Sequence, residues 1–411
     1  MIENEKIQAI LQKEHKDQPT LIQKQTYDAI KNGASVVALA KTGTGKTLAY
    51  ALPALERLQP GEKNALVILA PTTELAVQIR NAIQPFAKAL GLKTLALVGA
   101  GNRQRQDERL KKETNEVLVC TPGRFFDFFS SGRIKLGQIK SLVIDEADDI
   151  LEFAKLDLLS SLGQNLPSSS QILLFGATES QITREAEEIF ARHFLLIDVR
   201  PDQSSQTEHL FLQVDNEHKL EYLQRLCKLD GFRGLLFFDS NETMLRFAKI
   251  FAHSKTKFAI LANNFSKDKR QQAIRDLAKG KVKLLLATDL AARGLDIPKL
   301  TYVVNYEIPE DANTYMHRAG RTGRMQRQGR VVTLGNDHDL RKLKKLLAGE
   351  ASVDRVYFAG YHLSKDKPVK KAKEDKKAAV LEAGKKKKKS RKKNKNKGYH
   401  PHYLKGKKQS D

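Results

Sequence analysis

One short segment of the sequence has the residue types and spacing of a phosphate-binding loop. The segment Ala40-Lys41-Thr42-Gly43-Thr44-Gly45-Lys46-Thr47 follows an apolar run and opens an amphipathic helical stretch. Gly43, Thr44 and Gly45 form a turn whose backbone N–H groups can curl around phosphates, and the helix start adds a favourable dipole. We expect Lys46 to reach the β and γ phosphates of a nucleotide and the Thr47 hydroxyl to bind Mg²⁺. Taken alone, a Gly- and Thr-rich loop without a ligand is the alternative.

A second segment supplies carboxylates for the same chemistry. The run Ser141 to Ile144 favours a buried strand, and Asp145-Glu146-Ala147-Asp148 follows it directly. Carboxylates at the carboxyl end of a parallel strand face the ligand crevice. We expect Asp145 to hold the metal through water and Glu146 to orient and deprotonate an attacking water. A solvated acidic turn is the alternative for this tetrapeptide alone, but the two motifs together predict hydrolysis of a nucleoside triphosphate.

Parallel sheets are the elements expected to position these motifs. Short β-branched or leucine-rich runs alternate with amphipathic helical stretches, which is typical of parallel sheets covered by helices. In the first half the expected strands are Val36 to Ala40, Ala65 to Ala70, Thr94 to Val98, Val117 to Cys120, Leu142 to Ile144 and Ile172 to Phe175. In the second half they are Leu210 to Val214, Leu235 to Phe238, Lys257 to Leu261, Lys283 to Ala287, Tyr302 to Asn305 and Arg330 to Leu334.

The sequence therefore predicts an α/β fold with two tandem domains and a tail. The first domain is expected at residues 1–201 and the second at residues 208–362, joined by a polar linker at 202–207. Residues 363–411 are poor in apolar side chains and rich in lysine runs, so we expect this tail to be disordered. Its rings at Tyr399, His400, His402 and Tyr403 could stack on unpaired bases, and a solubilising role is the alternative.

Composition indicates a polyanionic partner. The net charge is +24, and from Lys365 to Asp411 there are 20 Lys and Arg against 5 Asp and Glu, so most of the excess lies in the tail. Neutralising phosphates releases counterions and supplies sequence-independent affinity. No window has the apolar length of a membrane span, and Met1 to Gln18 lacks the apolar core of a secretory signal, so a cytoplasmic protein is expected. Cys120 and Cys227 lack metal-ligand spacing and are expected to be reduced core thiols.

With these motifs in place, the chain from about Pro19 to Leu334 resembles the DEAD-box helicases. The resemblance implies two RecA-like domains of the P-loop NTPase type, RNA-stimulated ATP hydrolysis, and ATP with Mg²⁺ as cofactors. Pro19-Thr20-Leu21-Ile22-Gln23 is similar to the motif whose glutamine reads adenine, which implies that role for Gln23. Pro71 and Thr72, in Pro71-Thr72-Thr73-Glu74-Leu75-Ala76, and Thr121-Pro122-Gly123-Arg124 resemble the RNA-backbone motifs of the first domain.

The second domain resembles the same family at two further motifs. Thr288-Asp289-Leu290-Ala291-Ala292-Arg293-Gly294-Leu295-Asp296 is similar to the motif that contacts RNA phosphates, which implies RNA binding by Thr288, Arg293 and Gly294. Its final residue, Asp296, is implied to bind the ribose of ATP. In His317-Arg318-Ala319-Gly320-Arg321-Thr322-Gly323-Arg324, the resemblance implies arginine fingers at Arg321 and Arg324. The resemblance also implies that Asp148, Thr178 and His317 couple the ATP site to the RNA site.

Several positions depart from the family pattern. Ala40 stands where the phosphate loop usually begins with glycine, and no aromatic residue that could stack on adenine is present near Lys6, so looser adenine selectivity is expected. Gly176-Ala177-Thr178 stands where the family has Ser-Ala-Thr, so the hydroxyl directed toward the Asp145 to Asp148 carboxylates is missing, and weaker coupling of hydrolysis to strand separation is expected. Thr73 replaces an arginine and Ala100 a glycine, and both changes are expected to weaken RNA-backbone contacts in the first domain.

The resemblance thus predicts an ATP-dependent RNA helicase that separates short duplexes or remodels RNA-protein complexes. A monomer acting on structured or ribosomal RNA, with ribosomal precursor particles as partners, is expected from similarity to compact bacterial members with lysine-rich ends. In a eukaryote the same lysine runs could direct nuclear import. An ATP-gated RNA clamp or scaffold with little unwinding is the alternative, and Gly176 favours it. A DNA helicase of the same superfamily is disfavoured because such relatives have other residues at 145–148.

Overall fold

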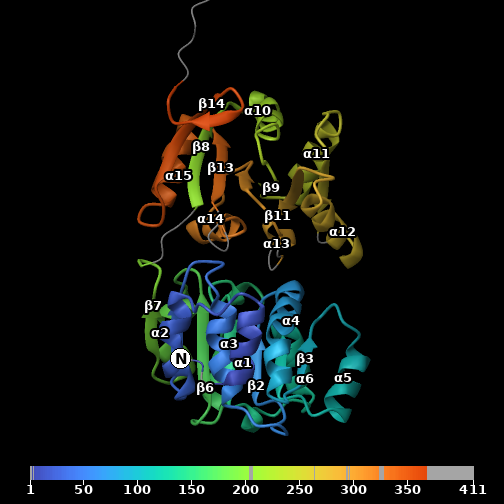
Figure 1. Cartoon of the computed structure of the whole chain (residues 1–411), viewed down its shortest axis with the longest axis vertical. Helices are drawn as coiled ribbons and strands as arrows, with labels where there is room; N and C mark the ends of the chain where they lie inside the picture. Colours follow the sequence, from blue (N-terminus) through green and yellow to red (C-terminus); the bar gives the residue numbers. More distant parts are fainter. Residues whose placement is uncertain are drawn as a thin grey trace, which may run out of the picture. The chain divides into compact units, whose positions relative to one another are not determined.

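Two sheets built from successive halves of the chain carry the motifs (Figure 1). The structure is a computed structural model that describes residues 2, 4–202, 207–262, 264–292, 295, 297–323 and 328–367, without the side chains of residues 152 and 267. We call residues up to 198 the first lobe and residues 207–366 the second lobe. Both belong to one compact unit, residues 1–366. The predicted tail beyond residue 367 and linker residues 203–206 lie outside the described residues.

The first lobe contains a seven-stranded sheet in the order β3-β4-β2-β5-β6-β1-β7, with every neighbouring pair parallel. Its strands are β1 (Val36–Leu39), β2 (Leu66–Leu69), β3 (Thr94–Leu97), β4 (Val117–Cys120), β5 (Ser141–Asp145), β6 (Gln171–Gly176) and β7 (Leu195–Asp198). Its helices are α1 (Glu5–Lys13), α2 (Leu21–Lys31), α3 (Lys46–Glu56), α4 (Thr73–Ala89), α5 (Arg103–Lys112), α6 (Pro122–Ser130), α7 (Leu156–Asn165), α8 (Gln181–Arg184) and α9 (Ala186–Phe190).

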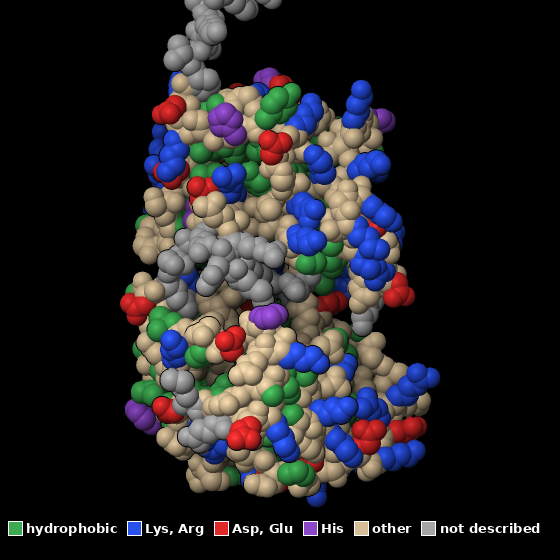
Figure 2. Space-filling view, viewed as in Figure 1, with side chains coloured by type: hydrophobic (Ala, Val, Ile, Leu, Met, Phe, Trp, Pro, Cys, Tyr) green, Lys and Arg blue, Asp and Glu red, His purple; other side chains and the backbone are tan. Residues whose placement is uncertain are grey.

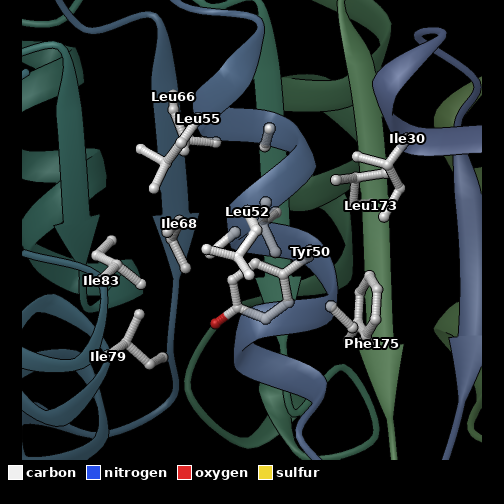
Figure 3. Close-up of a cluster of buried hydrophobic side chains, with 14 of the residues drawn as sticks. Ile30, Tyr50, Leu52, Leu55, Leu66, Ile68, Ile79, Ile83, Leu173 and Phe175 are labelled. Carbon is white, nitrogen blue, oxygen red and sulfur yellow. The ribbon is translucent and has the colours of Figure 1, made fainter. Parts of the chain in front are cut away.

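Alternate residues of these strands face two separate cores, as the two-residue period of a strand requires. One core packs α1 to α4 against one face of the sheet, and the other packs α5, α6, α7 and α9 against the opposite face. Figure 3 shows the first core, where Tyr50, Leu52 and Leu55 of α3 lie among side chains of α2, α4, β2 and β6. This packing fixes α3, whose first residue is Lys46.

The second lobe contains an eight-stranded sheet in the order β10-β11-β9-β12-β13-β8-β14-β15, in which only the β14–β15 pair is antiparallel. Its strands are β8 (Thr207–Gln213), β9 (Gly234–Phe238), β10 (Phe258–Leu261), β11 (Leu284–Thr288), β12 (Tyr302–Asn305), β13 (Gly329–Gly335), β14 (Val353–Ala359) and β15 (His362–Ser364). Its helices are α10 (Lys219–Leu226), α11 (Asn241–Phe251), α12 (Lys267–Ala278), α13 (Asp289–Ala292), α14 (Ala312–Ala319) and α15 (Asp337–Leu346).

Helices again cover both faces of this sheet. α10 and α11 pack on one face, while α12, α14 and α15 pack on the other. All twelve strands expected from the sequence are present, with ends shifted by a few residues at most, so the predicted two-sheet α/β fold is confirmed. β15 continues to Ser364, two residues past the expected domain end at 362. Both cysteines are buried and free, as expected.

Truncating one buried and one exposed side chain should test which residues contribute to the first core. Phe86 of α4 is fully buried in the first core, so Phe86→Ala should lower the free energy of unfolding by about 3–5 kcal/mol. Leu196 of β7 is 63% exposed, so Leu196→Ala should change it by less than about 0.5 kcal/mol. Urea unfolding followed by circular dichroism measures both. Equal losses in the two variants would show that this core is misassigned.

Candidate nucleotide and RNA site

The phosphate-binding loop lies at the carboxyl end of β1 and leads into α3. Gly43 and Gly45 have φ angles of 77° and 92°, a left-handed backbone that glycine adopts without steric cost. Gly45 is also the residue that caps the start of α3. The Lys46 ammonium donates to the Ala40 carbonyl at 3.1 Å, and Thr44 Oγ1 donates to the Lys41 carbonyl at 2.7 Å. These bonds close the loop on itself and hold Lys46 at its rim.

Gln23 connects the adjoining helix to this loop. Its Nε2 donates to the Gly45 carbonyl at 3.1 Å, and its Oε1 accepts from the Thr20 backbone N–H at 3.0 Å. A Cβ at position 45 would lie 2.6 Å from Gln23 Nε2, so the approach requires glycine. Gln23 therefore lies at the phosphate loop, and its expected role in reading adenine stays a prediction.

Asp145 ends β5 and is buried beside the same loop. The strand order β5-β6-β1 brings the carboxyl end of β5 within one strand of the loop. Tyr50 Oη donates to Asp145 Oδ2 at 2.9 Å. Burial, reinforced by the Asp145 charge, raises the pKa of Tyr50 well above its usual value, so the phenol keeps its proton. Tyr50 thus holds Asp145, one of the two residues expected to bind the metal, a role that the sequence did not reveal.

Asp145 and Glu146 are neighbouring carboxylates at the end of β5, and their charges repel each other. Burial and repulsion from Glu146 raise the pKa of Asp145 to about 6, although Lys46 acts in the opposite direction. Glu146 has a φ of 50°, and its Oε2 is buried without a hydrogen-bond partner among the described residues. An unpaired buried carboxylate oxygen is costly unless a water or cation completes it. Hydroxyl and carboxylate oxygens at Thr47 and Asp145 are the donors that Mg²⁺ prefers, so the residues fit that ion.

Asp148 joins the carboxyl ends of β5 and β6. Its Oδ2 accepts from the Ala177 N–H at 3.0 Å, the Thr178 N–H at 2.9 Å and Thr178 Oγ1 at 2.8 Å. Its other oxygen, Oδ1, is buried and has no partner in the described part of the chain. A Cβ at Gly176 would lie 3.3 Å from Asp148 Oδ1. The hydroxyl missing at position 176 would therefore be directed at the oxygen that is left without a donor.

His317, on α14 of the second lobe, binds two aspartates of the first lobe. Its Nε2 lies 3.0 Å from Asp148 Oδ2 and its Nδ1 lies 2.8 Å from Asp149 Oδ2. Burial would lower the pKa of His317, but the hydrogen bonds to both carboxylates outweigh it and raise the pKa to about 10. The hydrogen bond of Nε2 to Asp148 and the ion pair of Nδ1 with Asp149 both favour the imidazolium, which has a proton on each ring nitrogen. Burial would raise the pKa of Asp148, but its bonds to His317 hold that pKa well below its usual range.

The lobes also approach at the phosphate loop itself. Gly320 follows α14, and a Cβ there would lie 1.8 Å from Thr42 Oγ1. A cleft of about 740 Å³ opens at this approach, lined from both lobes. Its lining includes the expected residues Gln23, Gly43, Thr44 and Gly45, and also His15, Lys16, His209 and Met316, which the sequence had not indicated. The structure thus brings Gln23 and the loop at 43–45 to one cleft, whereas the expected residues Lys46, Thr47, Asp145 and Glu146 are not among its lining residues.

Of the two expected arginine fingers, Arg321 lies within the described residues and Arg324 does not. Arg321 is 8% exposed, and its Nη1 donates to the Leu295 carbonyl at 3.2 Å, so its guanidinium binds the segment that contains the second-lobe RNA motif. Arg324 and the expected ribose ligand Asp296 lie outside the described residues, as do Arg293 and Gly294. Arg318 was not expected to have a role, yet its nearly buried guanidinium binds Asp289 at 2.6 Å and Asp239 at 2.9 Å. It holds α14 to the carboxyl ends of β9 and β11.

The expected RNA residues of the first lobe follow two neighbouring strands. Pro71 and Thr72 follow β2, and Thr72 Oγ1 caps α4 by accepting from the Leu75 N–H at 3.3 Å. The segment 121–124 follows β4, the neighbour of β2, with Thr121 as the cap of α6 and Pro122 and Gly123 in its first turn. Arg124 Nη2 donates to the Gly99 carbonyl at 3.0 Å, so this arginine holds the loop after β3. Thr288 ends β11 in the second lobe.

Comparison with known proteins places the chain in a family. Residues 20–186 match the DEAD/DEAH box helicase family, and residues 218–326 match the helicase conserved C-terminal domain. The chain is 35% identical over 347 residues to Probable ATP-dependent RNA helicase YfmL of Bacillus subtilis, covering 83% of this chain and 92% of that protein. It is 34% identical over 326 residues to DEAD-box ATP-dependent RNA helicase CshC of Bacillus cereus, covering 79% and 84%.

A solved structure agrees with these relatives. S. cerevisiae Dbp5 bound to RNA and ADP BeF3 superimposes with a TM-score of 0.75 at 26% identity, covering 86% of this chain and 93% of that chain. The chain therefore belongs to the DEAD-box family of ATP-dependent RNA helicases, and the relatives described here place it with bacterial members. ATP hydrolase and RNA helicase activity follow from that membership, and the expected RecA-like domains are confirmed. No helix in the described part of the chain is both long and apolar enough to cross a bilayer.

Restoring the missing hydroxyl at position 176 should strengthen coupling. Gly176→Ser should supply a donor to Asp148 Oδ1, worth on the order of 1 kcal/mol, and raise duplex strands released per ATP about fivefold. Gly176→Ala is the matched control, because it adds the same Cβ without the donor. Strand release and phosphate release measured together give the ratio. If the serine variant does no better than the alanine variant, Asp148 Oδ1 is not the limiting contact.

We call the contacts of His317 with Asp148 and Asp149 the joint between the lobes. Because His317 is charged in this joint, its contribution to stability should depend on pH. Since the pKa of His317 is raised on folding, its stabilisation is complete below about pH 6.5, declines as the pH rises and is lost above about 10. The difference in free energy of unfolding between the wild type and His317→Gln should therefore shrink from pH 6.5 to 10. Denaturant titrations at several pH values measure it. A difference that does not vary with pH would mean that His317 is neutral in the joint.

Proposed function

We propose that the protein uses ATP and Mg²⁺ to close its two lobes around RNA and thereby separate short RNA duplexes or remodel RNA-protein complexes. The observation that carries this proposal is the shared carboxylate of Asp148. That one group binds the backbone at the end of β6, beside the nucleotide motifs, and His317 of the second lobe. A change at the nucleotide is thereby transmitted to the position of α14.

On this proposal the first lobe holds the triphosphate and its metal. The loop at 43–45 and the Lys46 ammonium bind the phosphates, while Gln23 reads adenine. Thr47 and Asp145 hold Mg²⁺, with Tyr50 holding the Asp145 carboxylate in place. Bound Mg²⁺ would neutralise charge on the phosphate oxygens. These assignments are supported by the position of Gln23 and the loop at 43–45 in one cleft and by the oxygen donors of Thr47 and Asp145.

Glu146 is proposed as the general base. Its buried, unpartnered Oε2 lies next to Asp145, where a water attacking the γ phosphate would need an acceptor. The carboxylate orients that water and takes its proton. Arg321 and Arg324 of the second lobe then stabilise the charge that develops on the transferred phosphoryl group, a contribution of about 10³ to 10⁵ in turnover in related enzymes. For Arg321 this requires exchange of its bond to the Leu295 carbonyl.

RNA is proposed to bind across the same edges of both sheets. The backbone contacts come from Pro71, Thr72 and residues 121–124 in the first lobe and from Thr288, Arg293 and Gly294 in the second. A strand held at both places favours the closed arrangement, so RNA and ATP assist each other's binding, as linkage requires. Dbp5, which has the same fold, was solved with RNA and a nucleotide analogue bound. Asp148, Thr178 and His317 are the residues that we assign to this coupling.

An ATP-gated RNA clamp is the second candidate, and it is favoured by Gly176. Because Asp148 Oδ1 has no donor in the described residues, the joint lacks one bond that a serine would provide. A weaker joint would hydrolyse ATP with fewer separation events. We further propose a cytoplasmic monomer that acts on structured or ribosomal RNA, including ribosomal precursors, supported by the basic excess of the sequence.

Glu146→Gln tests the proposed function directly. The amide cannot take a proton, so ATP turnover should fall at least about 10²-fold, while ATP and RNA binding persist and a closed complex accumulates. Turnover assays with RNA, together with fluorescence anisotropy of labelled RNA, measure the two properties. Glu188→Gln, an exposed change on α9, should leave both unchanged. Retained turnover in Glu146→Gln would rule out this general base.

A further inference from the structure

Five exposed lysines gather at the edge of the second sheet that is opposite to its functional motifs. We call this set the lysine edge: Lys255, Lys257, Lys279, Lys281 and Lys283. They precede β10 and β11, two neighbouring strands whose first residues, Phe258 and Leu284, pair in register. The backbone N–H of Lys283 donates to the Lys257 carbonyl at 3.0 Å, so the two approaches to the sheet run side by side.

The segment that contains the lysine edge has a large excess of positive charge. Residues 246–283 contain eleven Lys and Arg and two Asp and Glu. Of those two acids, Asp276 is paired with Lys281 at 3.6 Å and accepts from Gln272. Within the part of the chain that the structure describes, Lys255, Lys257 and Lys279 have no acidic partner. Figure 2 shows Lys and Arg side chains gathered over α11 and α12.

α12 runs between the two ends of the strands of the second sheet. It begins on the side of their carboxyl ends, where the RNA motif lies, and ends at the lysine edge. Near its start, Arg270 pairs with Glu74, which belongs to the first-lobe RNA motif. Its final cap is Lys279 of the lysine edge, exposed Lys269 precedes Arg270, and exposed Arg275 lies between Arg270 and Lys279. A helix of 12 residues spans about 18 Å, so an RNA leaving the motif edge would follow this basic path for roughly that distance.

We propose that the lysine edge is a second RNA-backbone surface, which binds duplex or structured RNA flanking the strand held by the family motifs. This inference rests on the proposed RNA function. It adds a contact with the part of the RNA that lies outside the family motifs. Phosphate recognition suits the surface, because Ser254, Thr256 and Gly280 separate the lysines and the stretches 254–257 and 279–283 contain no aromatic side chain. Protein interfaces use buried aromatic anchors at their centre, whereas phosphate contacts need only cations, hydroxyls and backbone N–H groups.

The test compares two RNAs and two variants of the full chain. The edge variant changes Lys255, Lys257, Lys279 and Lys281 to Gln, and leaves Lys283, whose ammonium binds the Cys227 carbonyl. The control changes Arg341, Lys342, Lys344 and Lys345 of α15 to Gln, which removes the same charge from the side of the sheet near β13. One RNA is a short single strand, and the other is the same strand followed by a duplex. Affinity for each is measured against salt concentration.

Only the RNA that carries the duplex should lose affinity in the edge variant. Each lost phosphate contact lowers the slope of log affinity against log salt by about 0.7–0.9, so a loss of two to four contacts should lower it by about 1.5–3.5. The short strand should keep its affinity and its stimulation of ATP turnover, and the α15 control should change neither RNA. An equal loss with the control, an equal loss for both RNAs, or no loss at all would overturn the proposal. Failure of the short strand to bind the wild type would instead contradict the proposed function.

Discussion

The side chain of Asp148 is fully buried, and a buried carboxylate must be paired. Two backbone N–H groups and one hydroxyl from the end of β6 supply three of its bonds, and His317 supplies the fourth. Removing either side leaves a charge without compensation in a dry environment, which is strongly unfavourable. The nucleotide side of the first lobe and α14 of the second lobe are therefore linked through one anion. On the proposed function, this shared carboxylate is the contact through which the nucleotide affects the position of α14.

The same helix, α14, gathers the other connections of the second lobe. Arg318 holds it to Asp289 and Asp239, at the ends of β11 and β9. Arg321, just beyond its end, binds the Leu295 carbonyl of the RNA-motif segment. Gly320, between them, allows Thr42 of the phosphate loop to approach closely. On the proposed function, α14 and the residues just after it therefore connect the nucleotide cleft, the RNA motif and the proposed arginine finger, and this connection is the proposed basis for reciprocal coupling between the ligands.

Most strands could be predicted from the sequence, including the edge strands β3 and β10, but β7, β14 and β15 could not. Val117–Cys120 and Tyr302–Asn305 were placed to the residue, because strands buried on both faces are continuous apolar runs. β7 was missed since Leu195 and Leu196 are exposed at the sheet edge, and only four residues mark it. β14 and β15 were missed because their alternation is short and partly polar.

The site shows the same division between local and distant information. The phosphate loop and the carboxylates at 145–148 are contiguous motifs, so their types and spacing were enough to place them. Tyr50 was not found, because its bond to Asp145 joins residues 95 positions apart and an apolar helix face gives no signal for it. Arg318 was passed over for a similar reason, since its partners lie 29 and 79 positions away. Side-chain pairs that only the fold brings together leave no pattern in the sequence.

A double-mutant cycle between Asp148 and His317 tests the central claim most directly. RNA-stimulated ATP turnover is measured for Asp148→Asn, His317→Gln and the pair together. If the shared carboxylate couples the lobes, each single change lowers turnover and the double variant is little worse than the more damaging single one. If the two losses multiply instead, the residues act independently, and Asp148 is not the link between the nucleotide and the second lobe.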